Sequence, residues 1–441
     1  MTTTLDSRNA QPPEITREKP APTFSPALRD VYPKVGVEEF LSIAERFGFN
    51  PKAMERLAAA VSDDDLPKGG PHLGRYYGSP KPIKGEQFEA LALKTFDVQY
   101  ALAVSSGTAA LHCAMIGVGA GPGTEVICAA SGFIATALAC GLAGATPVFC
   151  DVDESLQMNP ALIEKLITPK TVAIAPTHHW GSVCDMDPIL EIARKHGLKV
   201  IEDCAQSPGA TYKGRPVGSL GDFGCFSISC YKIIGGGEGG MVVTNNERSF
   251  DRVRQMAEGG GLWRPDRCAP ERYEGELFIG GNFRLSELES AINVVQLRKL
   301  PEVVARYREV WRTIRGRLGS YREIIWQKSN DMEGDIGYMF RFFPANDDLG
   351  RKLSEALVAM GISASYRGKN SRPDWHIQRD MFPLFRAFPE LNRDDICPLG
   401  SDLFDRRITI ALNQWWTPED CEQFAAGLNH VLSTYCTQID S

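Results

Sequence analysis

The sequence predicts an α/β protein whose large domain holds a mostly parallel sheet covered by helices on both faces, followed by a smaller α+β domain. Between residues 67 and 309, short apolar runs typical of buried strands alternate with helical patterns, as consecutive βα units require. The chain has 441 residues, of which 43% are hydrophobic, so it can bury one large core and a second, smaller one.

Residues 1–66 form a predicted N-terminal extension. Its first 32 residues or so are rich in proline and lack hydrophobic periodicity, so we expect an extended or disordered arm. Residues 36–60 carry two short amphipathic helical patterns, broken at Asn50–Pro51. This extension serves either as an arm that packs against a dimer or as a cover over a substrate site.

The predicted large domain spans residues 67–309. Strands are expected at 100–106, 125–131, 147–152, 172–178, 199–204, 223–229 and 239–245, and helices at 108–120, 133–144 and 188–197. A long amphipathic helix begins near Leu285 and continues past Pro301 toward residue 318. It leads into the predicted small domain, residues 310–441, with strands at 338–343 and 408–412 and helices at 349–361 and 418–432.

Composition and charge exclude several classes of function. The net charge of −7 argues against a nucleic-acid partner, because such proteins usually present a basic face. No run of eighteen apolar residues and no apolar signal core occur, so we expect a cytoplasmic protein without a membrane partner. The twelve cysteines form no CxxC pair and the seven histidines no HExxH motif, which predicts reduced, buried thiols and no metal site.

Three segments place a lysine, a carboxylate and an anion-binding turn at the ends of predicted strands. Lys232 follows the strand FGCFSIS, and its amine can bind an aldehyde covalently and transfer protons. Asp203 ends the strand KVIEDC, where an open α/β sheet collects its ligands, and can keep a pyridinium nitrogen protonated. Gly107 and Thr108 begin a helix, where free amides and the helix dipole favour a phosphate. Together these groups indicate pyridoxal 5′-phosphate (PLP), although each alone is compatible with a structural role.

The motifs SSGTAAL, EDCAQSPGATYKGRPVGSLGDFGCFS, GEGGMVVT and GGNFRLSELESAINVVQL resemble the DegT/DnrJ/EryC1/StrS family of sugar aminotransferases. The likeness runs from about Gly85 to the C-terminus and thins after Leu300. It implies PLP fold type I and an enzyme, a PLP-dependent aminotransferase, that carries PLP on Lys232. Such an enzyme passes nitrogen from glutamate or glutamine, through pyridoxamine phosphate, to a keto-sugar or keto-cyclitol, possibly nucleotide-linked.

The resemblance assigns further cofactor contacts. It places Ser227 on the phosphate, Gln206 beside the phenolic oxygen of the ring, and Phe133 against the face of the pyridine. The alternatives are an ordinary strand hydroxyl for Ser227 and core packing for Phe133. Asn282 lies in a loop that, in the family, crosses to the neighbouring subunit and contacts the phosphate, which implies a homodimer with shared active sites.

Three residues are expected to face the substrate. His178 matches a family histidine, and Trp180 stands in a loop that borders the substrate pocket in the family. The chain departs from the family there, since His179–Trp180 replaces a common Leu–Tyr pair. His376 lies near a family histidine in a segment that aligns poorly, and a satisfied surface histidine is the competing interpretation.

Two other functions stay open. A PLP-dependent sugar dehydratase of the same family is one. Lys232 argues against the branch that lacks this lysine, but a lysine-retaining dehydratase with an iron–sulfur partner remains. The other is a non-catalytic PLP-binding regulator, which the presence of all the cofactor groups disfavours.

Overall fold

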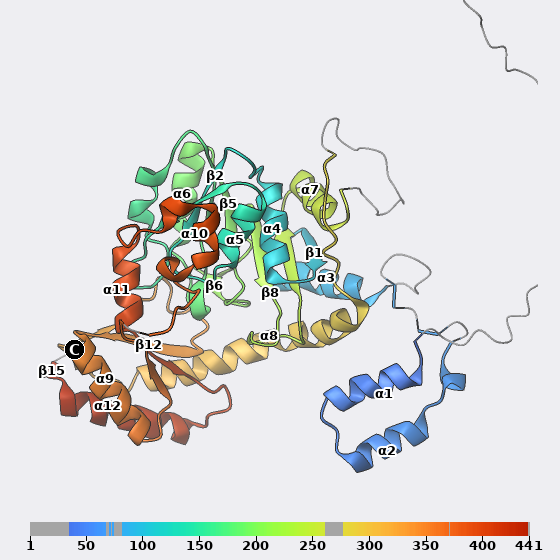
Figure 1. Cartoon of the computed structure of the whole chain (residues 1–441). Coiled ribbons are helices and arrows are strands. Elements are labelled where there is room, and N and C mark those ends of the chain that lie inside the picture. The colour runs from blue at the N-terminus through green and yellow to red at the C-terminus, as the bar shows by residue number, and fades with distance from the viewer. Residues whose placement is uncertain are drawn as a thin grey trace, which may run out of the picture. The chain divides into compact units, whose positions relative to one another are not determined.

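The computed structural model describes residues 35–67, 70–71, 73–74, 82–260, 277–369 and 371–439. The predicted arm at residues 1–32 lies outside these ranges. The chain divides into two compact units, residues 1–72 and residues 73–441, and Figure 1 shows the elements of each.

The first unit contains the two predicted helices, α1 (Val37–Arg46) and α2 (Pro51–Ala60), followed by the short 3-10 helix η2 (Asp63–Asp65). The predicted break between the helices is confirmed. Asn50 caps α2 because its Oδ1 accepts a hydrogen bond from the amide of Ala53 at 3.0 Å. Pro51 occupies the first helical position, where its missing N–H costs nothing.

The second unit is built on a seven-stranded sheet in the order β1-β9-β8-β5-β4-β2-β3. Neighbouring strands from β8 to β3 pair in parallel, whereas β9 runs antiparallel to both β1 and β8. The predicted mostly parallel sheet is therefore confirmed. The strands are β1 (Tyr100–Val104), β2 (Glu125–Ala129), β3 (Thr146–Cys150), β4 (Thr171–Ala175), β5 (Lys199–Asp203), β8 (Phe223–Ser227) and β9 (Gly240–Thr244).

Helices cover both faces of this sheet, as alternate residues of its strands show. Leu102 of β1 belongs to a core cluster with residues of α4 and α5, while the adjacent Ala103 belongs to a second cluster with residues of α3, α6 and α8. Side chains that follow one another along a strand point to opposite faces. The helices are α3 (Lys84–Thr95), α4 (Gly107–Gly117), α5 (Ala135–Leu142), α6 (Met186–His196) and α7 (Glu247–Ala257).

The long helix α8 (Glu287–Arg315) continues through Pro301, as predicted, and runs from the large sheet to a second, smaller sheet (Figure 1). The smaller sheet is antiparallel, in the order β11-β12-β14-β13, and has its own core with α9 and α12. Its elements are β11 (Ile324–Trp326), β12 (Met339–Pro344), α9 (Asp347–Ala359), β13 (Ala364–Tyr366), β14 (Ile408–Ala411) and α12 (Pro418–Tyr435).

The remaining elements are short. Two further sheets have two strands each. One pairs β6 (Thr211–Tyr212) with β7 (Arg215–Pro216), and the other pairs β10 (Ser320–Tyr321) with β15 (Gln438–Ile439). Two helices precede β14, α10 (Phe382–Ala387) and α11 (Pro398–Arg406). The 3-10 helices are η3 (Pro160–Leu162), η4 (Glu164–Leu166), η5 (His179–Gly181), η6 (Gln378–Asp380) and η7 (Pro389–Leu391).

The described cysteines are free and mostly buried, as expected, but one of them is exposed. All eleven described cysteines are free, and nine of them are buried. Cys230, which the sequence assigned to an apolar strand run, is exposed because β8 ends at Ser227 and the chain then turns. In the described part of the chain, none of the helices combines the length and apolarity that crossing a membrane demands.

Candidate active site

Lys232 lies in the turn that joins β8 to β9, at the carboxyl end of the parallel strands. Its side chain is half-buried, and its backbone N–H donates to the carbonyl of Ser229 at 3.0 Å. Burial lowers the pKa of the Lys232 amine, although the carboxylates of Asp203 and Glu238 oppose this shift. A lowered pKa increases the fraction of neutral amine, which is the nucleophilic form.

Asp203 is the last residue of β5, and its carboxylate is held from two sides. Only 3% of the residue is exposed. Its Oδ2 accepts a hydrogen bond from the Thr136 hydroxyl at 2.6 Å, and its Oδ1 accepts one from the amide of Ala205 at 3.0 Å. Sequence reasoning missed Thr136, because a threonine in the first turn of α5 carries no signal of a partner 67 residues away.

The N-terminus of α4 provides free backbone donors beside Ser227. Ser106 caps the helix with its hydroxyl on the amide of Ala109 at 3.0 Å. The amides of Gly107 and Thr108 have no acceptor among the described residues, as expected for the first turn of a helix. A Cβ on Gly107 would lie 2.7 Å from the Cβ of Ser227. Glycine therefore lets the helix end approach the end of β8 closely.

Gly240, the first residue of β9, also lies close to the N-terminus of α4. A Cβ there would lie 2.3 Å from the carbonyl oxygen of Ser106. The sequence predicted Gly107, Thr108 and Ser227 for this place but not Gly240. Two free amides, a helix dipole and a serine hydroxyl are a donor set that fits a phosphate.

A pocket of about 380 Å³ opens beside Lys232. The structure brings three other predicted site residues to its walls: Gln206, Trp180 and His376. Gln206 Oε1 accepts a hydrogen bond from the backbone N–H of Trp180 at 3.1 Å, which ties two of the walls together. Tyr338, another wall residue, donates its hydroxyl to the backbone carbonyl of Gln206 at 3.2 Å.

Phe133 and His376 lie next to each other, with ring centroids 5.3 Å apart. Phe133 is 42% exposed, so its ring does not serve the core packing that was the alternative interpretation. His376 Nδ1 lies 2.7 Å from Oδ1 of Asp374. Although burial alone raises the pKa of Asp374, His376 and Arg407 hold it well below its usual range. The imidazole is thus oriented by a carboxylate.

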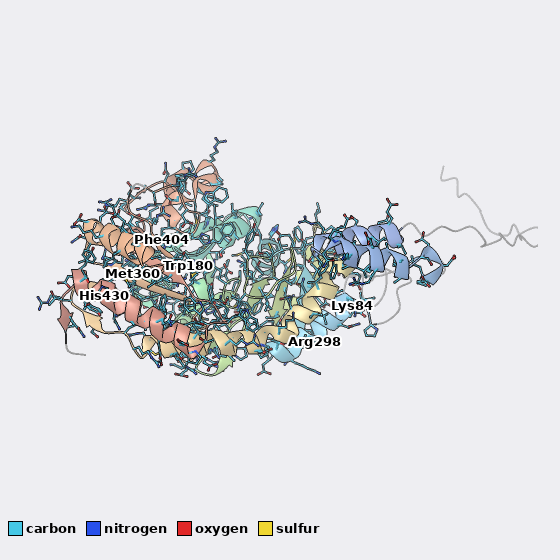
Figure 2. The ribbon with its side chains drawn as sticks, turned by 90° about the horizontal axis from the view of Figure 1, so that it is seen from below. Lys84, Trp180, Arg298, Met360, Phe404 and His430 are labelled. Carbon is cyan, nitrogen blue, oxygen red and sulfur yellow. The ribbon has the colours of Figure 1, made fainter. Side chains whose placement is uncertain are left out.

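Trp180 has a left-handed backbone, with φ 56° and ψ 37°, which is unfavourable for a bulky residue. Its indole stacks on His179 with centroids 3.7 Å apart and lies 5.4 Å from the ring of Phe404 on α11; Figure 2 labels Trp180 and Phe404. Contacts with both rings hold the strained loop in place.

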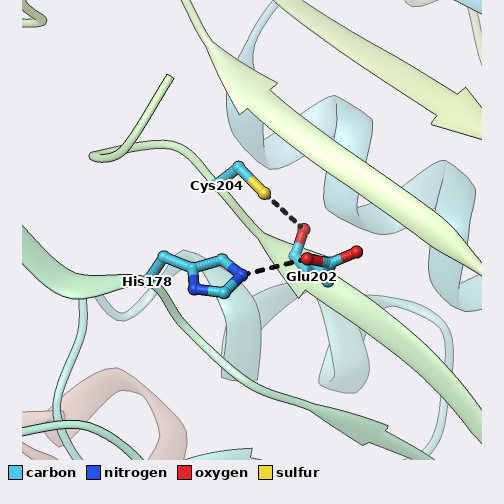
Figure 3. A group of neighbouring side chains, drawn as sticks. All are labelled: His178, Glu202 and Cys204. Carbon is cyan, nitrogen blue, oxygen red and sulfur yellow. Dashed lines mark hydrogen bonds and ion pairs between the residues drawn. The ribbon is translucent and has the colours of Figure 1, made fainter. Parts of the chain in front are cut away.

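The structure does not bring His178 to the pocket. Its ring is fully buried, with Nε2 3.1 Å from Oε2 of Glu202 (Figure 3). Its Nδ1 accepts a hydrogen bond from the amide of Cys184 at 3.1 Å. The adjacent His179, which the sequence marked only as a departure from the family, stacks on Trp180 and His376 instead. Its Nδ1 lies 2.6 Å from the Ser131 hydroxyl. Burial lowers the pKa of His179 well below its usual range, so its ring is neutral.

His178, Glu202 and Cys204 lie close enough to suggest a metal site, since their ligand atoms fall within 4.8 Å of one another (Figure 3). Glu202 already accepts four hydrogen bonds. Besides His178, its donors are the amides of Gly218, Leu220 and Gly221, at 2.7 to 2.9 Å. Burial raises the pKa of Cys204 well above its usual value, so the thiol is neutral. These three side chains therefore form a hydrogen-bonded structural cluster.

Asn282 stands apart from the other predicted cofactor residues. It is exposed, its backbone pairs with Glu258, and it is not a wall residue of the Lys232 pocket. Within one chain, the structure thus does not bring Asn282 to Lys232.

Comparisons with known proteins agree with this geometry. Over 351 residues, the chain is 42% identical to the GDP-perosamine synthase of Caulobacter vibrioides, covering 78% of this chain and 89% of that protein. It is 40% identical to the L-glutamine:2-deoxy-scyllo-inosose aminotransferase of Streptoalloteichus tenebrarius over 46% of this chain and 49% of that protein. The solved aminotransferase from Psychrobacter cryohalolentis superposes with a TM-score of 0.69 at 28% identity, covering 82% of this chain and 93% of that one.

The profile of one family matches residues 83–372, a segment that includes Lys232, Asp203 and the N-terminus of α4. PLP fold type I, expected from the resemblance, is confirmed by the shared fold. The chain belongs to the DegT/DnrJ/EryC1/StrS aminotransferase family.

Proposed function

We propose that this protein is a PLP-dependent aminotransferase that transfers an amino group from glutamate or glutamine to a keto-sugar or keto-cyclitol. The main support is that three groups lie at one edge of the sheet: Lys232 with its lowered pKa, the buried carboxylate of Asp203 and the free amides at the N-terminus of α4. The names of the two relatives, a perosamine synthase and a glutamine-dependent inosose aminotransferase, support the acceptor class and the donor.

The residues present fit PLP. When bound, the cofactor supplies an electron sink for the carbon that carries the amino group. We assign the phosphate to the free amides of α4 and the Ser227 hydroxyl, and covalent attachment to Lys232. Asp203 would hold the proton on the ring nitrogen, Gln206 would contact the phenolic oxygen and Phe133 would stack on the ring.

The surrounding residues keep these groups in position. Thr136 fixes one oxygen of Asp203 and leaves the carboxylate with unused lone pairs for the ring nitrogen. Lys232, partly neutral when free, moves protons to and from the reacting carbon. Trp180 and His376 form the substrate side of the pocket, orient the acceptor and exclude water. His178 has no direct substrate contact in this proposal.

The proposal includes a homodimer with shared active sites, located in the cytoplasm. Asn282 is exposed in a single chain, and the neighbouring Ile279 is 96% exposed, which supports a subunit interface at this loop. We also propose a large domain over residues 67–309 and a small domain over residues 310–441. The small sheet has a core of its own with α8, α9 and α12, which supports this division. Phe343 and several residues between Ile377 and Phe404 pack instead in the core of the large sheet.

Absorption spectroscopy tests the reaction. The band of the lysine-bound cofactor should disappear when glutamate or glutamine is added and return when the correct keto-substrate follows, because nitrogen is stored on the cofactor in between. Lys232→Ala should abolish turnover. A native spectrum that responds to no amino donor would favour the non-catalytic alternative, and a deoxygenated sugar without added nitrogen would identify a dehydratase.

Subunit mixing tests the shared site. Lys232→Ala and Asn282→Ala homodimers should each be impaired, whereas mixed dimers contain one site with both native groups and should recover part of the activity. A fully active monomer would contradict the shared site.

A further inference from the structure

Tyr307 on α8 is a wall residue of the Lys232 pocket whose hydroxyl is unused. The residue is half-buried, and Gln206 and Tyr338 line the same pocket. Among the described residues, none forms a hydrogen bond with the Tyr307 hydroxyl, and its oxygen stays accessible rather than sealed in the core. An accessible hydroxyl in the same pocket as the reactive lysine is available to a bound molecule.

The neighbouring Tyr338 has a different task, because its hydroxyl supports the protein. It donates to the backbone carbonyl of Gln206 at 3.2 Å. The rings of Tyr307 and Tyr338 meet edge to face, with centroids 6.0 Å apart and planes at 62°. This contact orients the Tyr307 ring and leaves the hydrogen-bonding capacity of its hydroxyl for a ligand.

The backbone of α8 is fixed on both sides of Tyr307. Three residues earlier, Val304 is buried in a core cluster of the large sheet. The next residue, Arg308, donates from Nε to the carbonyl of Asp335 at 2.9 Å and from Nη2 to the carbonyl of Gly334 at 2.7 Å. A group that is already held in place loses little conformational freedom when a ligand binds. Tyr307 is therefore a preformed contact point of the pocket.

The chemistry of the Tyr307 hydroxyl matches an alcohol better than an anion. Burial raises the pKa of Tyr307, so the phenol is neutral and can both donate and accept. Carboxylates and phosphates bind charged donors more strongly, whereas the hydroxyl of a sugar or cyclitol also donates and accepts. The pocket volume of about 380 Å³ is typical of small-molecule sites, and the apolar wall residues Pro208, Ile233 and Leu412 can cover the C–H faces of a ring.

We propose that Tyr307 binds a ring hydroxyl of the acceptor and thereby selects keto-sugars or keto-cyclitols that carry a hydroxyl at that position. This specificity role rests on the proposed aminotransferase function and adds a residue of α8 to the acceptor side of the pocket. A site built to bind a substrate hydroxyl discriminates strongly against an analogue without it, because its own polar group is then left unpaired. Glutamate and glutamine have no alcohol group, so their binding should not depend on the Tyr307 hydroxyl.

Calorimetry on Tyr307→Phe, which removes only the hydroxyl, tests the proposal without turnover. The probes are 2-deoxy-scyllo-inosose with the PLP-loaded enzyme and GDP-perosamine with the pyridoxamine-phosphate-loaded enzyme, compounds that the names of two relatives contain. In each combination the ligand and the cofactor are both carbonyl compounds or both amines, so no nitrogen is exchanged. At least one probe should bind the native enzyme. Tyr307→Phe should bind that probe about 3- to 10-fold more weakly, the effect of losing one neutral hydrogen bond.

Two comparisons separate this role from a general disturbance of the protein. The apparent affinity for the amino donor, glutamate or glutamine, is measured from the absorption change of the PLP-loaded enzyme and should be the same in Tyr307→Phe as in the native protein. Tyr321→Phe is the matched control, since it removes a hydroxyl that donates to the carbonyl of Asn429 at 3.2 Å outside the pocket. It should bind the probe as the native protein does.

The proposal is wrong if neither probe binds the native enzyme, if Tyr307→Phe binds the probe as tightly as the native enzyme, or if its affinity for the amino donor falls by the same factor. A native spectrum that responds to neither glutamate nor glutamine would refute the proposed aminotransferase function instead. The calorimetric comparison would then still decide whether Tyr307 binds a ring hydroxyl.

Discussion

Replacing Gly107 by alanine should harm cofactor binding more than folding. The added Cβ would lie 2.7 Å from the Cβ of Ser227, about 1 Å closer than the optimal separation of two carbon atoms. Ser227 ends a strand that is paired on both sides, so it has little freedom to move away. Relieving the clash shifts the first turn of α4 from the position where we place the phosphate.

The magnitude follows from two opposing effects. Overpacking of this kind costs about 1–3 kcal/mol, and replacing a helical glycine by alanine returns about 0.5–1 kcal/mol. We expect Gly107→Ala to lower the free energy of unfolding of the cofactor-free protein by about 1–2 kcal/mol. The affinity for PLP should fall by about tenfold or more, because misplacing charge-assisted hydrogen bonds costs about 1.5–3 kcal/mol.

Urea unfolding measures the stability and fluorescence titration the PLP affinity. Gly121→Ala is the matched control, since its nearest neighbour would be the carbonyl oxygen of Ala143 at 4.0 Å. It should change both quantities little. Native PLP affinity in Gly107→Ala would refute the phosphate assignment, even if the stability falls as expected.

Three further predictions concern other buried side chains. Thr136→Val should lower kcat by about tenfold and move the pH profile of activity, since it removes the donor to Asp203, while Thr136→Ser should restore both. Asp203→Asn should still bind PLP but lose most turnover, whereas Glu202→Gln should mainly destabilise the fold, by about 1–3 kcal/mol for each amide left without an acceptor. Asp335→Asn should raise the stability above pH 6 by up to about 3 kcal/mol and leave it unchanged near pH 3. The reason is that the pKa of Asp335 is raised to about 6 in the folded state, so its ionisation costs stability as the pH rises from about 4 to 6.

Much of the fold was predictable from the sequence, because its signals are local. Each strand of the large sheet is an apolar run, and the glycines and Ser106 at the start of α4 mark the turn before a helix. Lys232 and Asp203 were predictable for the same reason, as both follow such runs directly. The partners that fix them were not, because the Thr136 hydroxyl reaches Asp203 across 67 positions and no local pattern reports it.

The two histidines show why the substrate side was harder to predict. Resemblance favoured His178, but its ring turns inward to Glu202, and His179 faces Trp180 and His376 instead. Which of two adjacent side chains enters a pocket depends on backbone angles in the loop. Those angles depend in turn on distant groups such as Gln206, whose side chain accepts the Trp180 amide.

Consecutive carboxylates at the end of β5 have different tasks because neighbouring strand residues face opposite sides of a sheet. Glu202 points to the side of the Gly218–Gly221 loop and His178, where four donors use all its lone pairs. Asp203 points to the α5 side and accepts only two hydrogen bonds, from Thr136 and Ala205. A carboxylate with its lone pairs filled can only hold the fold together. A carboxylate with free lone pairs can also bind a protonated ring nitrogen. Glu202 therefore has a structural role and the adjacent Asp203 a chemical one.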